Sequence, residues 1–104
     1  MVITEYKQEP KPKRIVEVNP VKSSNIKAIG YDEGKEILYI MFSTNVVYEY
    51  NPVKKHAYES LSNAKSLGQF FYAFIKSNNL YKCNKLGLDT EIKVVNKIKE
   101  ENNG

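Results

Sequence analysis

The side chains of this sequence that are best suited to chemistry are aromatic rings, ammonium groups and small hydroxyl or amide groups. Tyr48 and Tyr50 are two positions apart, so an extended strand would place both rings on one face. Ser23, Ser24 and Asn25 form a short polar run. Aromatic rings stack on nucleobases, whereas hydroxyls, amides and lysines bind ribose and phosphate. These residue types predict a binding site for a small nucleotide or a short single-stranded RNA.

The candidate ligand-binding residues lie in the middle of the chain. They are Ser23, Ser24, Asn25, Tyr31, Tyr48, Tyr50, Lys54 and Lys55. Core packing is the competing interpretation for the tyrosines, because strands favour tyrosine for packing alone. Tyr50 stands at the end of its expected strand and beside an expected helix start, where anions bind. Replacing it by alanine is therefore expected to weaken binding with little loss of stability.

No residue pattern predicts catalysis. The sequence has neither a Gly-x-Ser-x-Gly elbow nor a glycine-rich phosphate loop. His56 and Glu59 lie one helical turn apart, and Asp32 and Glu33 are adjacent, but exposed surface residues explain both pairs better. Cys83 is the only cysteine, and His56 is the only histidine, which is too few for a zinc site. We expect no catalytic residue, no metal and no cofactor.

Size and charge limit the class of protein. The 104 residues form one domain, and 41% hydrophobic with 27% charged residues is a globular balance. The net charge of +4 is dispersed along the chain, whereas duplex DNA binders usually carry a dense basic stripe, so duplex DNA is not an expected partner. There is no apolar run of membrane-spanning length and no signal-peptide pattern at the N-terminus. The expected location is the cytoplasm, the host's cytoplasm if a phage encodes the chain, with no membrane partner.

Alternating apolar residues and turn signals predict several short strands. The expected strands lie within residues 15–18, 25–31, 36–43 and 46–50, with 2–7 as an optional edge strand. The segment 36–43 is apolar on both of its faces. The helices would cover one face, and the other needs the N-terminal segment or a second subunit. This pattern predicts a homo-oligomer.

Two helices are expected after the strands. Asn51 and Pro52 match an N-cap and a first helical position, and Ser66 with Gln69 matches a capping box. A core-facing stripe follows, formed by Leu67, Phe70, Phe71, Phe74 and Ile75. The tail from residue 90 to residue 98 is expected to be helical, with a strand over 91–95 as the alternative. The predicted fold class is α+β, with a three- to five-stranded antiparallel sheet followed by two amphipathic helices packed on one face.

The order of these motifs resembles the KTSC domain, a small module at the C-terminus of some lysyl-tRNA synthetases and in stand-alone bacterial and phage proteins. The matching segments are Ser23–Ile26, Ile29–Asp32, the strand with Leu38, Ile40 and Phe42, Tyr48-Glu49-Tyr50, and Leu61, Ala64, Ser66, Gly68, Phe70-Phe71, Ile75 and Tyr81. The chain has Asn45 where the family often has glycine, and Tyr72 where it often has asparagine. The resemblance places a KTSC-like domain at residues 21–85. An N-terminal strand and connector extension (1–20) and a C-terminal extension (86–104), expected to be helical, flank it.

The resemblance implies a binding module, for which RNA is the usual suggestion. Three hypotheses follow from it and from the residues. The first is a phage-type anti-defence sponge, a homo-oligomer that sequesters a small cyclic nucleotide immune signal; such proteins look similar in architecture. The second is an accessory domain that binds single-stranded RNA or tRNA. The third is a protein-interaction module that uses the apolar sheet face.

Overall fold

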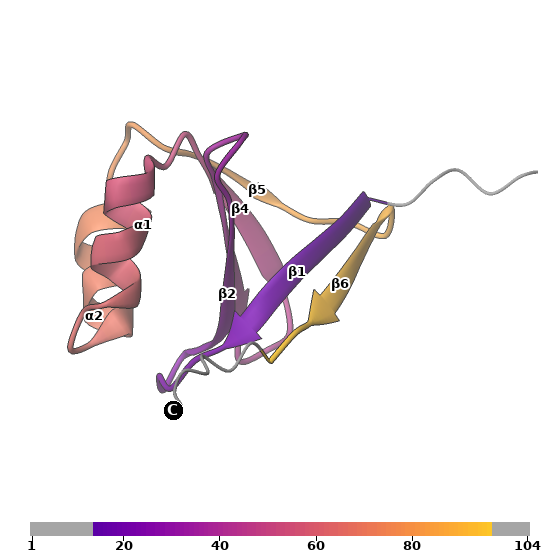
Figure 1. Cartoon of the computed structure of the whole chain (residues 1–104), viewed down its shortest axis with the longest axis horizontal. Helices are drawn as coiled ribbons and strands as arrows, with labels where there is room; N and C mark the ends of the chain where they lie inside the picture. Colours follow the sequence, from indigo (N-terminus) through magenta and orange to yellow (C-terminus); the bar gives the residue numbers. More distant parts are fainter. Residues whose placement is uncertain (1–13, 97–104) are drawn as a thin grey trace, which may run out of the picture.

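A computed structural model describes residues 14–96 as a curled, mostly β domain (Figure 1). The strands are β1 (Arg14–Pro20), β2 (Ile26–Asp32), β3 (Ile37–Phe42), β4 (Val47–Asn51), β5 (Lys82–Lys85) and β6 (Thr90–Val94). Helix α1 (Lys55–Ser62) follows β4, and α2 (Leu67–Phe70) continues directly into the π-helix η1 (Phe71–Lys76). The six strands form one sheet in the order β5-β4-β3-β2-β1-β6.

The expected three- to five-stranded antiparallel sheet is wrong, because the chain returns to the sheet after the helices and adds a strand at each edge. β5 pairs antiparallel with β4, and β6 pairs parallel with β1, which makes a six-stranded mixed sheet. The helices are short: α1 has eight residues, and α2 has four. In the tail, the strand alternative matches the structure at residues 90–94. The helix expected over 90–98 is therefore wrong in its described part. The optional strand at 2–7 lies outside the described residues.

The sheet must curl because its two edge strands are joined by a short connection. Only residues 86–89 separate β5 from β6, and an extended chain from Lys85 to Thr90 spans at most about 18 Å. In a flat sheet of six strands the two edges would be about 24 Å apart. The curl brings the edges close enough for this connection, and Figure 1 shows β1 and β6 swinging away from the plane of β2.

Gly30 gives β1 the space to follow this curl. β1 pairs with β2 at Asn19 and Pro20, opposite Ile29 and Ala28. A Cβ atom on Gly30 would lie 2.2 Å from the backbone oxygen of Glu17, which is closer than real Cβ contacts come. Gly30 does not have a positive φ, so the requirement is for space and not for a special backbone conformation.

Each face of the curled sheet carries its own hydrophobic core. Between the sheet and the helices lie residues such as Ile26, Leu38, Ile40, Leu61 and Phe71, all fully buried. Figure 1 shows both helical segments on this side. The helices therefore meet the sheet on one face only.

The second core lies inside the curl and is closed by the chain itself. Tyr39 and Met41 are each 6% exposed there, and they cluster with Val16, Val18 and Val47. This face was expected to be covered either by the N-terminal segment or by a second subunit. The structure shows the first of these, because β1 covers the face. The face thus gives no reason to require a second subunit.

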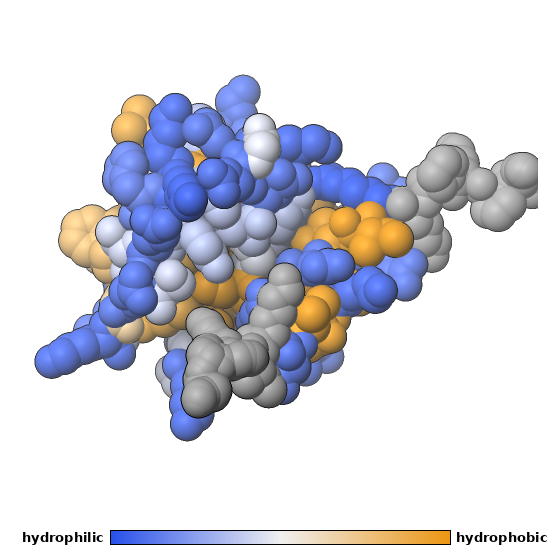
Figure 2. All heavy atoms as spheres, in the orientation of Figure 1, coloured by the Kyte–Doolittle hydropathy of each residue, from blue (hydrophilic) through white to orange (hydrophobic). Residues whose placement is uncertain are grey.

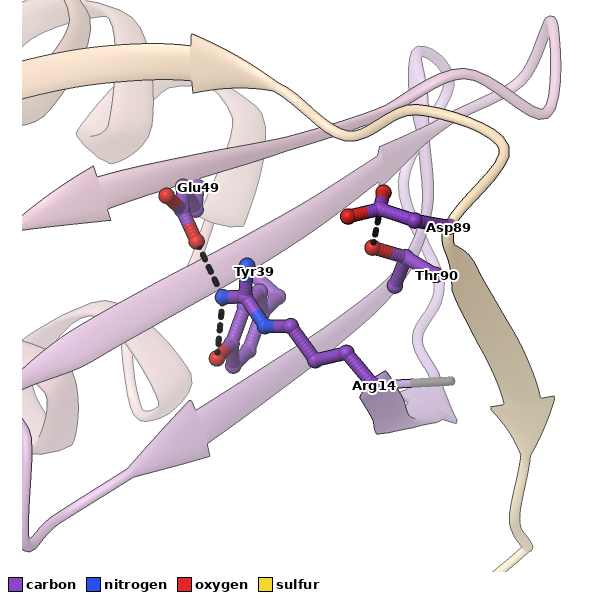
Figure 3. Close-up of polar contacts among 5 residues, drawn as sticks. All are labelled: Arg14, Tyr39, Glu49, Asp89 and Thr90. Atoms are coloured by element: carbon purple, nitrogen blue, oxygen red, sulfur yellow. Dashed lines mark hydrogen bonds and ion pairs between the residues drawn. The ribbon is translucent and has the colours of Figure 1, made fainter. Parts of the chain in front are cut away.

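A polar cluster fastens β1 across β3 and β4 (Figure 3). The Arg14 guanidinium donates to the Tyr39 hydroxyl at 3.2 Å and forms an ion pair with the Glu49 carboxylate. These two hydrogen bonds raise the pKa of Arg14. The Arg14 backbone N–H also donates to the carbonyl of Asp89, at 3.1 Å, in the connection between β5 and β6. The cluster joins β1 to the strands that the curl brings opposite it.

The two helix starts differ from each other in how well the sequence predicts them. Ser66 is the N-cap of α2, and its hydroxyl accepts from the Gln69 backbone N–H at 3.3 Å, as the capping-box pattern predicts. The first helix begins at Lys55 with Lys54 as its N-cap. The start predicted at Asn51 is wrong, because that residue ends β4 and the helix begins at Lys55.

The predicted core stripe of the second helix is narrower than expected. Leu67, Phe71 and Ile75 are buried, at intervals of four residues. Phe74 was expected in the same stripe but is 59% exposed, and its ring packs on Phe70 with centroids 4.8 Å apart. The register of the π-helix keeps one row of side chains against the sheet and turns Phe74 away from it.

Hydrophobic residues also reach the surface on the side of the outer strands, as Figure 2 shows. Ile15 of β1 and Val94 of β6 are 58% and 57% exposed. Of the helices in the described part of the chain, none has the length and apolar character needed to span a membrane.

Replacing Gly30 by alanine is expected to destabilise the fold by about 1–3 kcal/mol, because the new methyl group would press on backbone rather than on a mobile side chain. Urea denaturation measures the free energy of unfolding. Gly34→Ala is the matched control, because a Cβ at Gly34 would meet the Asp32 carboxylate at an ordinary contact distance of 3.6 Å. Equal stability of both variants would contradict a steric role for Gly30.

Candidate functional site

Two adjoining hollows lie where the helices meet one end of the sheet. The first, of about 610 Å³, is lined by Lys22, Ser23, Ser24, Asn25, Lys65, Ser66, Leu67, Gly68, Gln69, Tyr72 and Ala73. We call it the polar hollow. The second, of about 490 Å³, is lined by Asn25, Phe42, Ser43, Thr44, Val46, Tyr48, Tyr50, Tyr72, Lys76, Cys83 and Lys85. We call it the aromatic hollow. Asn25 and Tyr72 belong to both, so the hollows are neighbours.

The turn between β3 and β4 forms part of the wall of the aromatic hollow. The backbone N–H of Phe42 donates to the carbonyl of Val46 at 2.9 Å, and that of Asn45 donates to the carbonyl of Phe42 at 2.8 Å. Asn45 has φ of 73°, a left-handed conformation that asparagine tolerates better than most residues. Asn45 therefore adopts a backbone conformation that glycine would also allow. The turn sets Ser43 and Thr44 at the rim.

Five of the eight candidate residues come together at these hollows. Ser23, Ser24 and Asn25 line the polar hollow, while Tyr48 and Tyr50 line the aromatic hollow. The first three precede β2 directly, and the two tyrosines belong to β4. Strand pairing through β3 carries the two segments to the same region.

The other three candidates lie at the opposite end of the hairpin formed by β2 and β3. Tyr31 stacks on Tyr58 with ring centroids 4.5 Å apart, and its hydroxyl donates to the carbonyl of Val53 at 2.6 Å. Lys54 pairs with Glu36 at 3.3 Å, and Lys55 pairs with Glu33 at 3.6 Å. These lysines are matched with carboxylates, and they line neither hollow.

Tyr50 is more deeply buried than its position at a strand end predicted. It is 4% exposed, and its ring packs edge-on against Phe71 with centroids 5.3 Å apart. Burial, followed by a hydrogen bond with the Cys83 side chain, raises the pKa of Tyr50 well above its usual value. The expectation that Tyr50→Ala leaves stability nearly unchanged is therefore wrong, because the ring belongs to the core. Tyr48, at half burial, packs edge-on to Phe42 at 5.8 Å and is the more accessible of the two.

Several residues of the hollows were not among the candidates. They are Lys22, Lys65, Gln69, Tyr72, Lys76, Cys83 and Lys85. Tyr72 is 38% exposed, and the Lys76 ammonium lies 5.1 Å from the centroid of its ring. A helix extending from the capping box would have placed Tyr72 opposite the apolar stripe. Lys85 had no such signal, because every residue of β5 is exposed.

The hollows are positively charged. Lys22 and Lys65 line the polar hollow, and Lys76 and Lys85 line the aromatic hollow. No aspartate or glutamate lines either hollow, and within residues 14–96 none of these lysines forms an ion pair. The same residue range contains no cluster of histidine, cysteine or carboxylate groups that could hold a metal ion. The arrangement suits an anionic ligand that also carries an aromatic ring.

Comparison with known proteins shows which family the region around the hollows matches. The family model of the KTSC domain matches residues 22–81. The crystal structure of a KTSC domain protein from Yersinia pestis superposes with a TM-score of 0.63 at 37% identity, over 67% of this chain and 96% of that chain. A protein of Tsukamurella paurometabola is 36% identical over 59 residues, which are 57% of this chain and 88% of that protein.

A further relative is much longer than this chain. A lysine–tRNA ligase of a Nostoc species is 38% identical over 60 residues, which are 58% of this chain but 11% of the ligase. Strands β1, β5 and β6 lie outside the range that the family model matches. β5 still contributes Cys83 and Lys85 to the aromatic hollow.

The raised pKa of Tyr50 predicts a loss of stability in alkali. Its contribution is fully present below the unfolded-state pKa of about 10 and is lost as the pH rises towards the folded-state pKa, because only the unfolded chain then releases the proton. Urea unfolding at pH 8 and pH 11 should show this fall, and Tyr50→Phe should show a smaller one. All other groups are common to both proteins, so their contributions cancel. An identical fall in both would contradict the burial of a neutral phenol.

Proposed function

The chain belongs to the KTSC domain family, and on that premise we propose that it is a non-enzymatic module that binds a short single-stranded segment of RNA, such as an unpaired stretch of tRNA, across the two hollows. The observation that carries the proposal is the combination of accessible aromatic rings with four lysines and no carboxylate in the lining. The similarity to a lysine–tRNA ligase supports the choice of RNA.

The charge distribution favours this region over the end of the molecule that holds Lys54 and Lys55. There, carboxylates neutralise the lysines, and the nearby charges of Glu36 and Glu33 add to burial in raising the pKa of Tyr31. A phosphate would meet little net attraction at that end and attraction at the hollows. Of these two ends of the described domain, the one with the hollows is better suited to a nucleic acid.

The shape of the site favours a single strand over a duplex. The lysines surround two open hollows instead of following a straight line, and a paired base cannot enter a hollow without leaving its helix. Bases of a single strand are free to stack on tyrosine or phenylalanine rings, each such contact being worth roughly 1–3 kcal/mol. Duplex DNA thus remains outside the proposal.

The structure removes the argument that favoured the cyclic nucleotide sponge hypothesis. That hypothesis used an uncovered apolar face of the strand at 36–43 to drive oligomerisation, and β1 covers the face within one chain. The same burial weakens the protein-interaction hypothesis, which needed that face to be free. A homo-oligomer stays a prediction, and sedimentation velocity at micromolar concentration tests it.

The dependence of RNA affinity on salt is the sharpest test of the proposed surface. Fluorescence anisotropy with a labelled ten-nucleotide single-stranded RNA gives the Kd at several salt concentrations. Each lost phosphate contact makes the negative slope of log K against log salt shallower by about 0.7. Lys65→Gln and Lys85→Gln should each weaken binding and reduce the slope by about that amount.

The control variant is Lys54→Gln, which removes the same charge at the opposite end of the β2–β3 hairpin. It should leave both the Kd and the slope close to those of the unmodified protein. Equal losses of RNA affinity in the Lys54→Gln and Lys65→Gln variants would mean that binding depends on net charge alone. The absence of RNA binding by the unmodified protein would overturn the proposal itself.

A further inference from the structure

We propose, resting on the RNA-binding function above, that the two hollows divide a single nucleotide between them: the aromatic hollow takes an unpaired base, and the polar hollow takes the phosphate and ribose attached to it. The unit of recognition is then one flipped-out nucleotide of the strand. The inference goes beyond a general affinity for RNA because it assigns each part of the nucleotide to its own set of residues.

The aromatic hollow has the lining that a base needs. Phe42, Tyr48 and Tyr72 contribute rings from β3, β4 and the π-helix. Tyr48 is half-buried and Tyr72 is 38% exposed, so both are held by packing while part of each ring stays accessible. The Lys76 ammonium lies 5.1 Å from the Tyr72 ring centroid, where it adds positive charge beside a stacked base. Its volume of about 490 Å³ falls within the usual range for small ligands.

The polar hollow has the lining that a phosphate and a ribose need. Ser23, Ser24 and Gln69 bring hydroxyl and amide groups, and Lys22 and Lys65 bring charge. Within the described part of the chain, neither serine hydroxyl takes part in a protein hydrogen bond, so both are available to a ligand. The hydroxyl of Ser66, in contrast, is engaged in capping α2.

Ser23 lies close to the start of α2. A Cβ atom on Gly68 would lie 3.2 Å from the Ser23 hydroxyl oxygen, which is tighter than most real contacts. Gly68 therefore lets the Ser23 hydroxyl lie directly against the helix, and both residues line the polar hollow. A larger residue at this position would push the hydroxyl away.

Asn25 and Tyr72 form the boundary between the hollows, because each lines both. A ligand that fills both sides must be continuous past these two side chains. A nucleotide has this form, with an aromatic ring joined covalently to a charged group. A free base or a free phosphate would fill only one side.

Fragment mapping by NMR tests the division. Titrations of the ¹⁵N-labelled protein use adenine, ribose 5-phosphate and adenosine monophosphate as three separate probes. Adenine should shift the amides of Tyr48 and Lys85, and ribose 5-phosphate should shift those of Ser24 and Gln69. Adenosine monophosphate should shift both sets and bind on the order of tenfold more tightly than either fragment, because one linked ligand engages both hollows.

Paired variants separate the two contributions. Tyr48→Leu should weaken binding of adenine and of adenosine monophosphate by about fivefold or more while leaving ribose 5-phosphate binding unchanged. Ser24→Ala should weaken binding of ribose 5-phosphate and of adenosine monophosphate while leaving adenine binding unchanged. Tyr48→Phe is the matched control because it keeps the ring, so it should retain adenine binding even if Tyr48→Leu proves unstable.

The outcomes distinguish this inference from the proposed function. If the ten-nucleotide RNA binds but both fragments shift the same amides, or shift neither set, the division is wrong and the RNA-binding function stands. If the RNA itself fails to bind, the proposed function is overturned and the division falls with it. The division would be established if each fragment shifted its own set of amides and adenosine monophosphate shifted both sets.

Discussion

The four-residue connection between β5 and β6 is the constraint on which the rest of this fold depends. It joins strands at opposite edges of a six-stranded sheet, and a chain of that length cannot cross a flat sheet. The sheet therefore curls, and the curl needs Gly30, because any side chain there would strike the carbonyl of Glu17. Arg14 then ties the curled strand to Tyr39 and Glu49 (Figure 3). The curl covers one face of the sheet with the chain's own strand β1, and the helices cover the other face.

The candidate site is a product of this arrangement. β5 reaches the edge of β4 only because the chain returns to the sheet, and it brings Cys83 and Lys85 to the tyrosines of β4. The helix begun by Ser66 lies across from the segment before β2 and carries Tyr72 between the two hollows. Charge is separated along the molecule: Lys54 is paired with a carboxylate, whereas among residues 14–96 Lys65 and the other lysines of the hollows have no such pair. The similarity to a lysine–tRNA ligase supports RNA as the proposed ligand, and the hollows are the place that we propose for it.

Sequence reasoning predicted the features that depend on local patterns. The capping serine at Ser66 and the apolar strand before the Thr44 turn were both recognisable, because each follows from the side chains of a few neighbouring residues. β5 was missed because its four residues are all exposed, so burial leaves no alternation to detect. Its pairing is decided by the partner strand and the connection that follows. The first helix start was misplaced because Asn51, which resembles an N-cap, is the last residue of β4. Exposure of Tyr50 could not be judged without knowing that Phe71 packs on it.

The most direct test of the central claim uses Cys83, the only cysteine of the chain. It is exposed and lines the aromatic hollow, so the rate of its alkylation by iodoacetamide reports on occupancy of the site. The measurement is made with and without saturating ten-nucleotide single-stranded RNA, with binding followed by anisotropy in the same sample. Our account predicts that bound RNA slows alkylation several-fold, and that the Lys85→Gln variant needs more RNA for the same protection. An unchanged alkylation rate on fully bound protein would contradict the account, because the RNA would then occupy some other surface.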